Sequence, residues 1–229
     1  MKLEFESNLN YQQEAIKSIT DLFEGQPLED SILEFNLKEE GILNLINGVS
    51  NNLILSEEQI LTNLQGIQAN NEIKVSEKLD GMHFSVEMET GTGKTYVYLR
   101  SIYELYKLYG FKKFVIVVPS VAIREGVLKN LEITHEHFQI LYDNVPVNFQ
   151  VYDSTKISTL RGFVTTNNIE ILVINIDSFA KDENIINKPN DKLNGQKPIE
   201  FIQATHPIVI VDEPQNMETD IRKTAIANL

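Results

Sequence analysis

The chain has 229 residues, no cysteine and a formal charge of −13, with 42% hydrophobic and 23% charged residues. This composition is that of a globular protein large enough to bury a core, without disulfides or thiolate metal sites, and its net charge argues against a broad nucleic-acid-binding surface. No apolar stretch approaches the roughly 20 residues of a membrane span, and the first residues lack the order of a signal peptide, so we expect a cytoplasmic protein without a membrane partner.

The chain begins with a predicted helix. Apolar residues recur at helical spacing over residues 8–24, Asn10 is a candidate cap, and Gly25–Pro27 is expected to end the helix. We assign residues 1–27 to this N-terminal element.

Residues 28–80 form an acidic stretch that is rich in Asn, Leu and Ile. The pattern predicts two or three short helices, including Ser56–Gln68, where Ser56 and Gln59 have the spacing of a capping box. We expect an acidic helical insertion ahead of the core.

Residues 81–229 alternate between apolar runs and helical patterns, apart from a polar loop or small excursion at 181–198. The expected strands are 83–87, 114–118, 148–152, 169–176 and 208–211, and the expected helices are 94–109, 121–131, 156–163 and 199–204. Repeated β–α units predict an α/β fold, with a parallel sheet flanked by helices. In such sheets ligands bind at the carboxyl ends of the strands.

The sequence EMETGTGKT, which ends at Thr95, has the form of a phosphate-binding loop between a predicted strand and a predicted helix. Glycines allow the backbone N–H groups to face a polyphosphate, Lys94 reaches the outer phosphates, and the Thr95 hydroxyl suits Mg²⁺. A chance glycine-rich turn is the alternative, and the strand–loop–helix context favours the phosphate loop. The candidate nucleotide-binding residues are Thr90, Gly91, Thr92, Gly93, Lys94 and Thr95.

The apolar run at 208–211 ends in Asp212–Glu213. An isolated acidic pair at a strand end usually has no special role, but one that follows a phosphate loop can hold a metal and activate water. We expect Asp212 to bind Mg²⁺ and Glu213, together with Lys94, to be catalytic. Since both motifs follow predicted parallel strands, they can converge in space.

These motifs carry a resemblance to a known family. The sequences GTGKT and DEPQ resemble motifs I and II of superfamily 2 helicases and translocases. DEPQ together with METGTGKT resembles the Res subunit of type III restriction–modification endonucleases. Superfamily 2 tolerates a residue other than glycine at the first loop position, which here is Met88. The resemblance implies a RecA-like P-loop lobe at residues 81–229.

The resemblance also implies a glutamine that reads the adenine edge, which matches Gln12 in the first helix. Gln13 is adjacent, and a helix-surface glutamine is the alternative interpretation.

Nucleic-acid contacts are implied at two further segments. Pro119, Ser120 and Arg124 resemble motif Ia, which touches the backbone of one strand, and Asp177 and Ser178 follow the next buried strand. The alternative for the first segment is a plain strand-to-helix turn in which Ser120 caps the helix.

Two other clusters receive structural interpretations. His135 and His137 are two positions apart and do not share a helix face, so we expect a solvated helix end rather than a metal site. Tyr96, Tyr103 and Tyr106 have helical spacing, which predicts packing of this helix on the sheet rather than base stacking.

The resemblance implies the ATP-hydrolysing motor lobe of a DNA translocase, with ATP and Mg²⁺ as cofactors and double-stranded DNA and a methyltransferase (Mod) subunit as partners. The full-length enzyme would then cleave DNA at specific sites. The alternatives are another superfamily 2 DNA helicase, from a type I system or a phage, and a nucleotide-dependent binding module that is not a motor. The chain stops at Leu229 without a motif III, a second lobe or a nuclease segment, so we expect a truncated lobe with little activity of its own.

Overall fold

The computed structural model describes residues 5–28, 35–36, 47–193, 195–217 and 219–229. The chain forms two compact units. The first comprises Met1–Glu29, Leu53–Gly110 and Ile133–Tyr142, and the second comprises Asp30–Asn52, Phe111–Glu132 and Asp143–Leu229. The acidic segment 28–80 is therefore divided between the two units.

The first unit is helical. It contains α1 (Asn10–Asp21), α2 (Glu57–Asn70), α3 (Lys94–Tyr109) and the last turns of α4 (Val121–Leu141). Helix α3 has its predicted bounds and ends at Gly110, whose φ of 77° suits a helix C-terminus. The predicted capping box of α2 is also confirmed. The predicted cap of α1 is wrong, because the extended backbone of Leu9 starts the helix and Asn10 is its first residue.

Aromatic rings fill the interior of this unit. The Tyr103 ring centroid lies 4.9 Å from that of Phe138 and 5.0 Å from that of Tyr142, and burial raises the pKa of Tyr103 to about 12. The predicted packing role of this tyrosine is confirmed, but the partner in these ring contacts is the end of α4 and not the predicted sheet.

The predicted solvated helix end is wrong for His137. Its Nε2 lies 2.9 Å from the Tyr96 hydroxyl, and its ring lies 5.2 Å from that of Phe5. Burial lowers the pKa of His137. Among the described residues, no group of His, Asp and Glu side chains is arranged to hold a metal ion.

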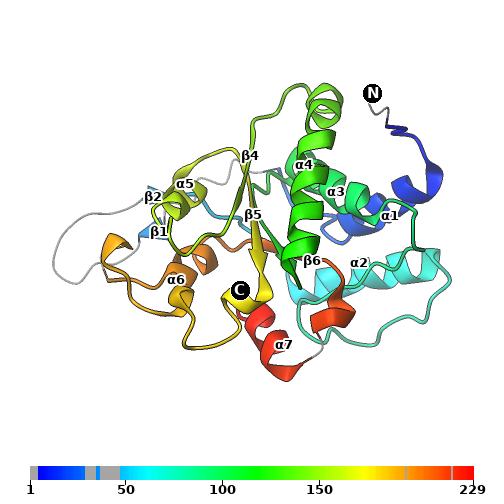
Figure 1. Cartoon of the computed structure of the whole chain (residues 1–229). Helices are drawn as coiled ribbons and strands as arrows, with labels where there is room; N and C mark the ends of the chain where they lie inside the picture. Colours follow the sequence, from blue (N-terminus) through cyan, green and yellow to red (C-terminus); the bar gives the residue numbers. More distant parts are fainter. Residues whose placement is uncertain (1–4, 29–34, 37–46, 194, 218) are drawn as a thin grey trace. The chain divides into compact units, whose positions relative to one another are not determined.

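The second unit is built on a four-stranded parallel sheet in the order β4-β5-β3-β6 (Figure 1). The strands are β3 (Lys113–Val118), β4 (Val147–Val151), β5 (Ile169–Asn175) and β6 (Ile208–Val211). Helices α5 (Thr159–Thr165), α6 (Pro198–Gln203) and α7 (Asp220–Ala227) accompany it. The predicted α/β fold with a parallel sheet and flanking helices is confirmed.

The core of this unit joins the sheet to its helices. Residues from β3 and β5 are fully buried, as expected of parallel strands covered on both faces. They pack with apolar side chains of α5 and α6 in one cluster that includes Val115, Val117, Leu172, Ile174, Leu160, Phe163, Phe201 and Ile202.

Two buried side chains of opposite charge lie at the amino end of the sheet. Lys113 and Glu170 face each other in the register of β3 and β5, and both are buried. The Lys113 ammonium donates to the carbonyls of Phe163 and Thr166 at 2.5 and 2.6 Å, at the end of α5. The Asn148 amide donates to the Glu170 carboxylate at 2.7 Å. Burial lowers the pKa of Lys113 to about 8 and raises that of Glu170.

The predicted strand at 83–87 is absent. Met82, Phe84 and Val86 alternate along the sequence, but their side chains are 42%, 37% and 47% exposed. A strand needs the backbone hydrogen bonds of a neighbour, and no strand among the described residues pairs with this segment.

Other differences concern element lengths and short elements. Strands β1 (Phe35–Asn36) and β2 (Asn47–Gly48) form an unpredicted antiparallel pair, and the other helices expected before residue 56 fall largely on residues outside the described ranges. Helix α4 runs to Leu141, beyond the predicted 131, because residues 132–141 contain no Gly or Pro that would end it. Helix α7 was not predicted. No helix of the described chain has the length and apolar character that crossing a membrane requires.

Candidate functional site

The loop before α3 has the backbone of an anion-binding turn. Gly91 and Gly93 adopt φ angles of 82° and 88°, a region that favours glycine. Gly93 is the N-cap of α3 and provides no capping side chain. The first amides of the helix therefore face outward with the partial positive charge of the helix start, next to the exposed side chain of Lys94. This arrangement fits a polyphosphate.

Gln12 packs directly on this loop. Its side chain is 7% exposed, and its Nε2 donates to the Thr92 carbonyl at 2.9 Å. The neighbouring Gln13 instead donates to the Ser7 carbonyl at 2.6 Å. Gln12 is thus the glutamine next to this loop. Its side-chain amide has two hydrogens, and the bond to the Thr92 carbonyl uses one of them.

The DEPQ sequence forms a tight turn after β6. The Asp212 amide donates to the Val117 carbonyl at 3.0 Å, which continues the β6–β3 ladder by one residue. Glu213 has a φ of 55°, in the left-handed region. Gln215 donates its side-chain amide to the Glu213 carboxylate. A non-glycine residue in this conformation costs about 1–3 kcal/mol. Glu72, Asp143, Asn144 and His206 also adopt a positive φ.

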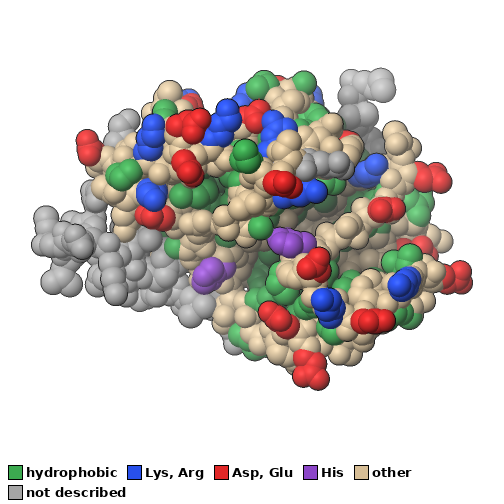
Figure 2. Space-filling model, turned by 90° about the horizontal axis from the view of Figure 1, so that it is seen from below, with side chains coloured by type: hydrophobic (Ala, Val, Ile, Leu, Met, Phe, Trp, Pro, Cys, Tyr) green, Lys and Arg blue, Asp and Glu red, His purple; other side chains and the backbone are tan. Residues whose placement is uncertain are grey.

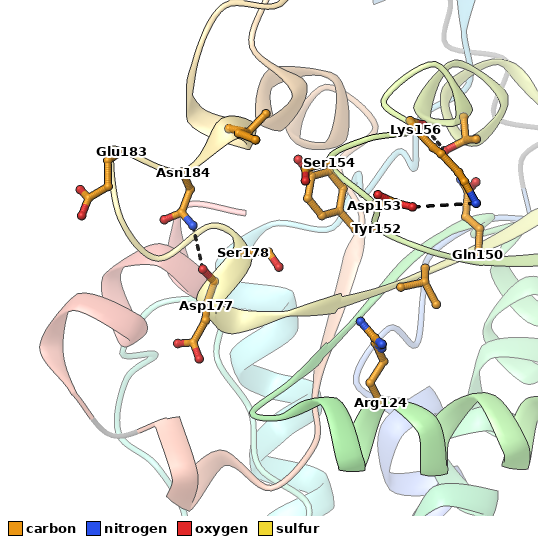
Figure 3. Close-up of a pocket in the computed structure, with 13 residues that line it drawn as sticks. Arg124, Gln150, Tyr152, Asp153, Ser154, Lys156, Asp177, Ser178, Glu183 and Asn184 are labelled. Carbon is orange, nitrogen blue, oxygen red and sulfur yellow. Dashed lines mark hydrogen bonds and ion pairs between the residues drawn. The ribbon is translucent and has the colours of Figure 1, made fainter.

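A cavity of about 900 Å³ opens at the carboxyl ends of β4 and β5. Three residues that the sequence analysis singled out for nucleic-acid contact, Arg124, Asp177 and Ser178, line it together (Figure 3). They come from α4 and from η1 (Ile176–Ser178), the 3-10 turn after β5. The strand-end rule for parallel sheets therefore places these separate segments around one cavity.

The rest of the cavity wall is mostly polar. Tyr152 directly follows β4, and its buried hydroxyl has no hydrogen-bond partner among the residues that the structure describes. Buried polar atoms are nearly always satisfied, so this hydroxyl is suited to a ligand or a water molecule. The further polar residues of the wall are Gln150, Asp153, Ser154, Lys156, Thr159, Glu183 and Asn184.

Two charged side chains of the cavity, Arg124 and Asp153, interact with neighbouring residues. The Arg124 guanidinium pairs with Glu125 at 2.9 Å, and hydrogen bonds from Thr155 lower the pKa of Asp153. Acidic and basic side chains are also interspersed on the face of the molecule that Figure 2 shows.

The other residues predicted to bind nucleic acid or metal lie outside the cavity wall. Pro119 and Ser120 follow β3 but do not line the cavity. The Ser120 hydroxyl accepts the Ile123 amide at 3.3 Å, so the helix-capping interpretation is confirmed. Thr95 belongs to the first unit, and Asp212 belongs to the second.

The sequence analysis missed the loop after β4, which contributes Tyr152, Asp153, Ser154 and Lys156 to the cavity. It carries no recognisable motif. The only signal was its position, because it directly follows a predicted strand of a parallel sheet, where ligands bind.

The comparison with protein families supplies the decisive finding. The family described as "Type III restriction enzyme, res subunit" matches residues 7–227. The chain belongs to this Res-subunit family. The predicted resemblance is confirmed, and with it the assignment of the fold to a helicase-like, RecA-type lobe.

Curated Res subunits are similar over most of the chain. The StyLTI Res subunit of Salmonella typhimurium strain LT2 is 34% identical over 62% of this chain, and the EcoP15I Res subunit of Escherichia coli is 31% identical over 73%. The EcoPI Res subunit of Escherichia phage P1 is 28% identical over 94%. The chain spans only 16%, 19% and 23% of the lengths of these three relatives, respectively.

Proposed function

We propose that this Res-family chain binds and hydrolyses ATP with Mg²⁺, as the motor lobe of a DNA translocase within a type III restriction endonuclease. The observation that carries the proposal is the turn before α3, with two left-handed glycines and an uncapped helix start beside Lys94. Such a turn binds phosphates through backbone amides, and the lysine adds a point charge for the outer phosphates.

In this proposal each motif has a separate task. The loop Thr90–Thr95 holds the phosphates, with the Thr95 hydroxyl on Mg²⁺, and Gln12 contacts both the loop and the adenine. Asp212 holds the metal, and Glu213 orients the water that attacks the γ-phosphate. The left-handed backbone of Glu213 and its bond from Gln215 support a carboxylate held in one orientation.

We further propose that the strand-end cavity binds the sugar–phosphate backbone of double-stranded DNA. Arg124 supplies a cation for a phosphate, and Ser178, Ser154 and Asn184 supply uncharged donors. Asp177 lies in the same wall, and Pro119 and Ser120 would hold the turn that presents Arg124. The names of the relatives describe subunits of restriction–modification enzymes, so we propose a methyltransferase subunit as partner and ATP-dependent, site-specific DNA cleavage by the complete enzyme.

Nucleotide binding tests the proposal. A fluorescent ATP analogue with Mg²⁺ should bind the wild type and not Lys94→Ala, whereas Lys107→Ala, a matched change of an exposed lysine in the last turn of α3, should bind as the wild type does. A wild type that binds no nucleotide would refute the proposal. Binding that does not respond to duplex DNA in any measurement would support a nucleotide-dependent module that is not a motor.

A further inference from the structure

Asp177 is held at three points in the wall of the cavity. Its amide donates to the Asn175 side chain at 2.8 Å, and its carbonyl accepts the Asn184 amide at 2.7 Å. Its carboxylate accepts from the Arg222 guanidinium at 2.6 Å. The first two bonds fix the backbone of the turn, and Figure 3 shows the carboxylate extending away from them. The Asp177 carboxylate is held by the Arg222 guanidinium.

Arg222 holds a second segment with its other terminal nitrogen. This residue lies in α7, and its NH1 donates to the Asn216 carbonyl at 3.0 Å while its NH2 contacts Asp177. Asn216 belongs to η4 (Pro214–Met217), the turn that directly follows Glu213. The planar guanidinium fixes both contacts in one rigid geometry.

The contact reaches the turn of Glu213 through the backbone. The Asn216 amide donates to the Glu213 carbonyl at 3.0 Å, and the next residue, Met217, is 2% exposed in the core. One end of the turn is thus anchored by core packing, and the other carries the left-handed Glu213. A shift of Arg222 acts on the part of the turn between these two points.

We propose that Arg222 is a positioning residue that couples the strand-end cavity to the DEPQ turn. This inference rests on the proposed function, in which the cavity binds a DNA backbone and Glu213 acts on ATP. A phosphodiester that enters beside Asp177 repels its carboxylate and attracts the guanidinium. Because the same guanidinium holds Asn216, occupancy of the cavity changes the constraint on the turn that carries Glu213.

The ion pair between Arg222 and Asp177 contributes little to the folding free energy, so its loss can be tested in a folded protein. The side chains of Arg222 and Asp177 are 29% and 65% exposed, and pairs of this kind add little to the folding free energy. Variants of Arg222 should therefore fold. The neighbouring Lys223 is exposed and serves as a control for loss of one positive charge on the same helix.

The experiment measures the Kd of a fluorescent ATP analogue with Mg²⁺ in the absence and presence of a saturating duplex oligonucleotide. In the wild type and Lys223→Met we expect DNA to change the Kd by about fivefold or more, the lower range of measured couplings between two sites. In Arg222→Met the ratio should fall to about one while the Kd without DNA stays within about twofold of wild type. Arg222→Lys keeps the charge but lacks the rigid fork, so it should bind DNA and still lose the coupling.

Each outcome distinguishes this inference from the proposed function. A wild type that binds neither ATP nor DNA refutes the proposed function, and with it the coupling. A wild type that binds both without coupling, or an Arg222→Met protein that keeps the wild-type ratio, overturns the role of Arg222 alone. Full coupling in Arg222→Lys would show that charge suffices and would overturn the bridging contact with Asn216.

Discussion

The contact between Gln12 and the phosphate loop gives a prediction that a matched pair of glycines can test. Gly91 and Gly93 have similar left-handed backbones, with φ angles of 82° and 88°. A Cβ at Gly91 would meet no atom within 4 Å, whereas a Cβ at Gly93 would lie 2.7 Å from Gln12 Nε2. Alanine at the two sites therefore differs mainly in its effect on Gln12.

The expected magnitudes follow from these two terms. The left-handed backbone costs an alanine about 1–2 kcal/mol at either site. At Gly93 the Gln12 side chain must also move and give up its bond to the Thr92 carbonyl, which costs a further ~0.5–1.5 kcal/mol. We expect Gly91→Ala to lower the free energy of unfolding by about 1–2 kcal/mol and Gly93→Ala to lower it by about 1.5–3.5 kcal/mol.

Urea denaturation of the two variants, alone and combined with Gln12→Ala, measures both terms. In the Gln12→Ala background the side chain that collides is gone, so the extra cost at Gly93 should disappear. Equal costs for the two alanine variants in the wild-type background would refute the reasoning. An extra cost at Gly93 that persists without the Gln12 side chain would refute it as well.

Three further predictions concern the buried Lys113, the cavity and the aromatic interior. Lys113→Met leaves the carbonyls of Phe163 and Thr166 without their donor and removes the positive charge near the buried Glu170. It should lower the free energy of unfolding by about 3–5 kcal/mol in urea denaturation. Burial lowers the pKa of Lys113 from 10.5 to about 8, so between these pH values the unfolded state binds more protons than the folded state. The free energy of unfolding of the wild type should therefore rise from about pH 8 to pH 10.5. The same rise in Lys113→Met would contradict this. Arg124→Ala should reduce the slope of log Kd for duplex DNA against the logarithm of the salt concentration by about 1. An unchanged slope would show that Arg124 contacts no DNA phosphate. Tyr96→Phe loses the hydrogen bond to His137 and should cost about 0.5–1.5 kcal/mol in the same denaturation assay, while an unchanged stability would show that ring packing alone holds this contact.

The elements that the sequence predicted well are those whose signals are local. Helix α3 has a glycine at each end, which marks its bounds. The apolar runs of β3 and β5 could be read as buried strands without knowledge of their neighbours. The roles proposed for the loop before α3 and for the DEPQ turn stay predictions, which rest on residue types that directly reflect a chemistry.

The features that were missed depend on contacts between distant segments. The choice between Gln12 and Gln13 required the position of the Thr92 carbonyl, 80 residues away in the chain. The strand expected at 83–87 has the right alternation, but the pattern does not supply the neighbour that a strand needs. The role of Arg222 became visible only where α7 meets the turn after β5, since no motif includes that arginine.

Asp212 is proposed to hold the Mg²⁺ of bound ATP. The most direct test is a titration of Mg²⁺ against binding of a fluorescent ATP analogue in the wild type, in Asp212→Asn and in the matched control Asp220→Asn. We expect Mg²⁺ to strengthen ATP binding in the wild type and in Asp220→Asn, and Asp212→Asn to lose most of this dependence. An Asp212→Asn protein with the Mg²⁺ dependence of the wild type would contradict this role of Asp212.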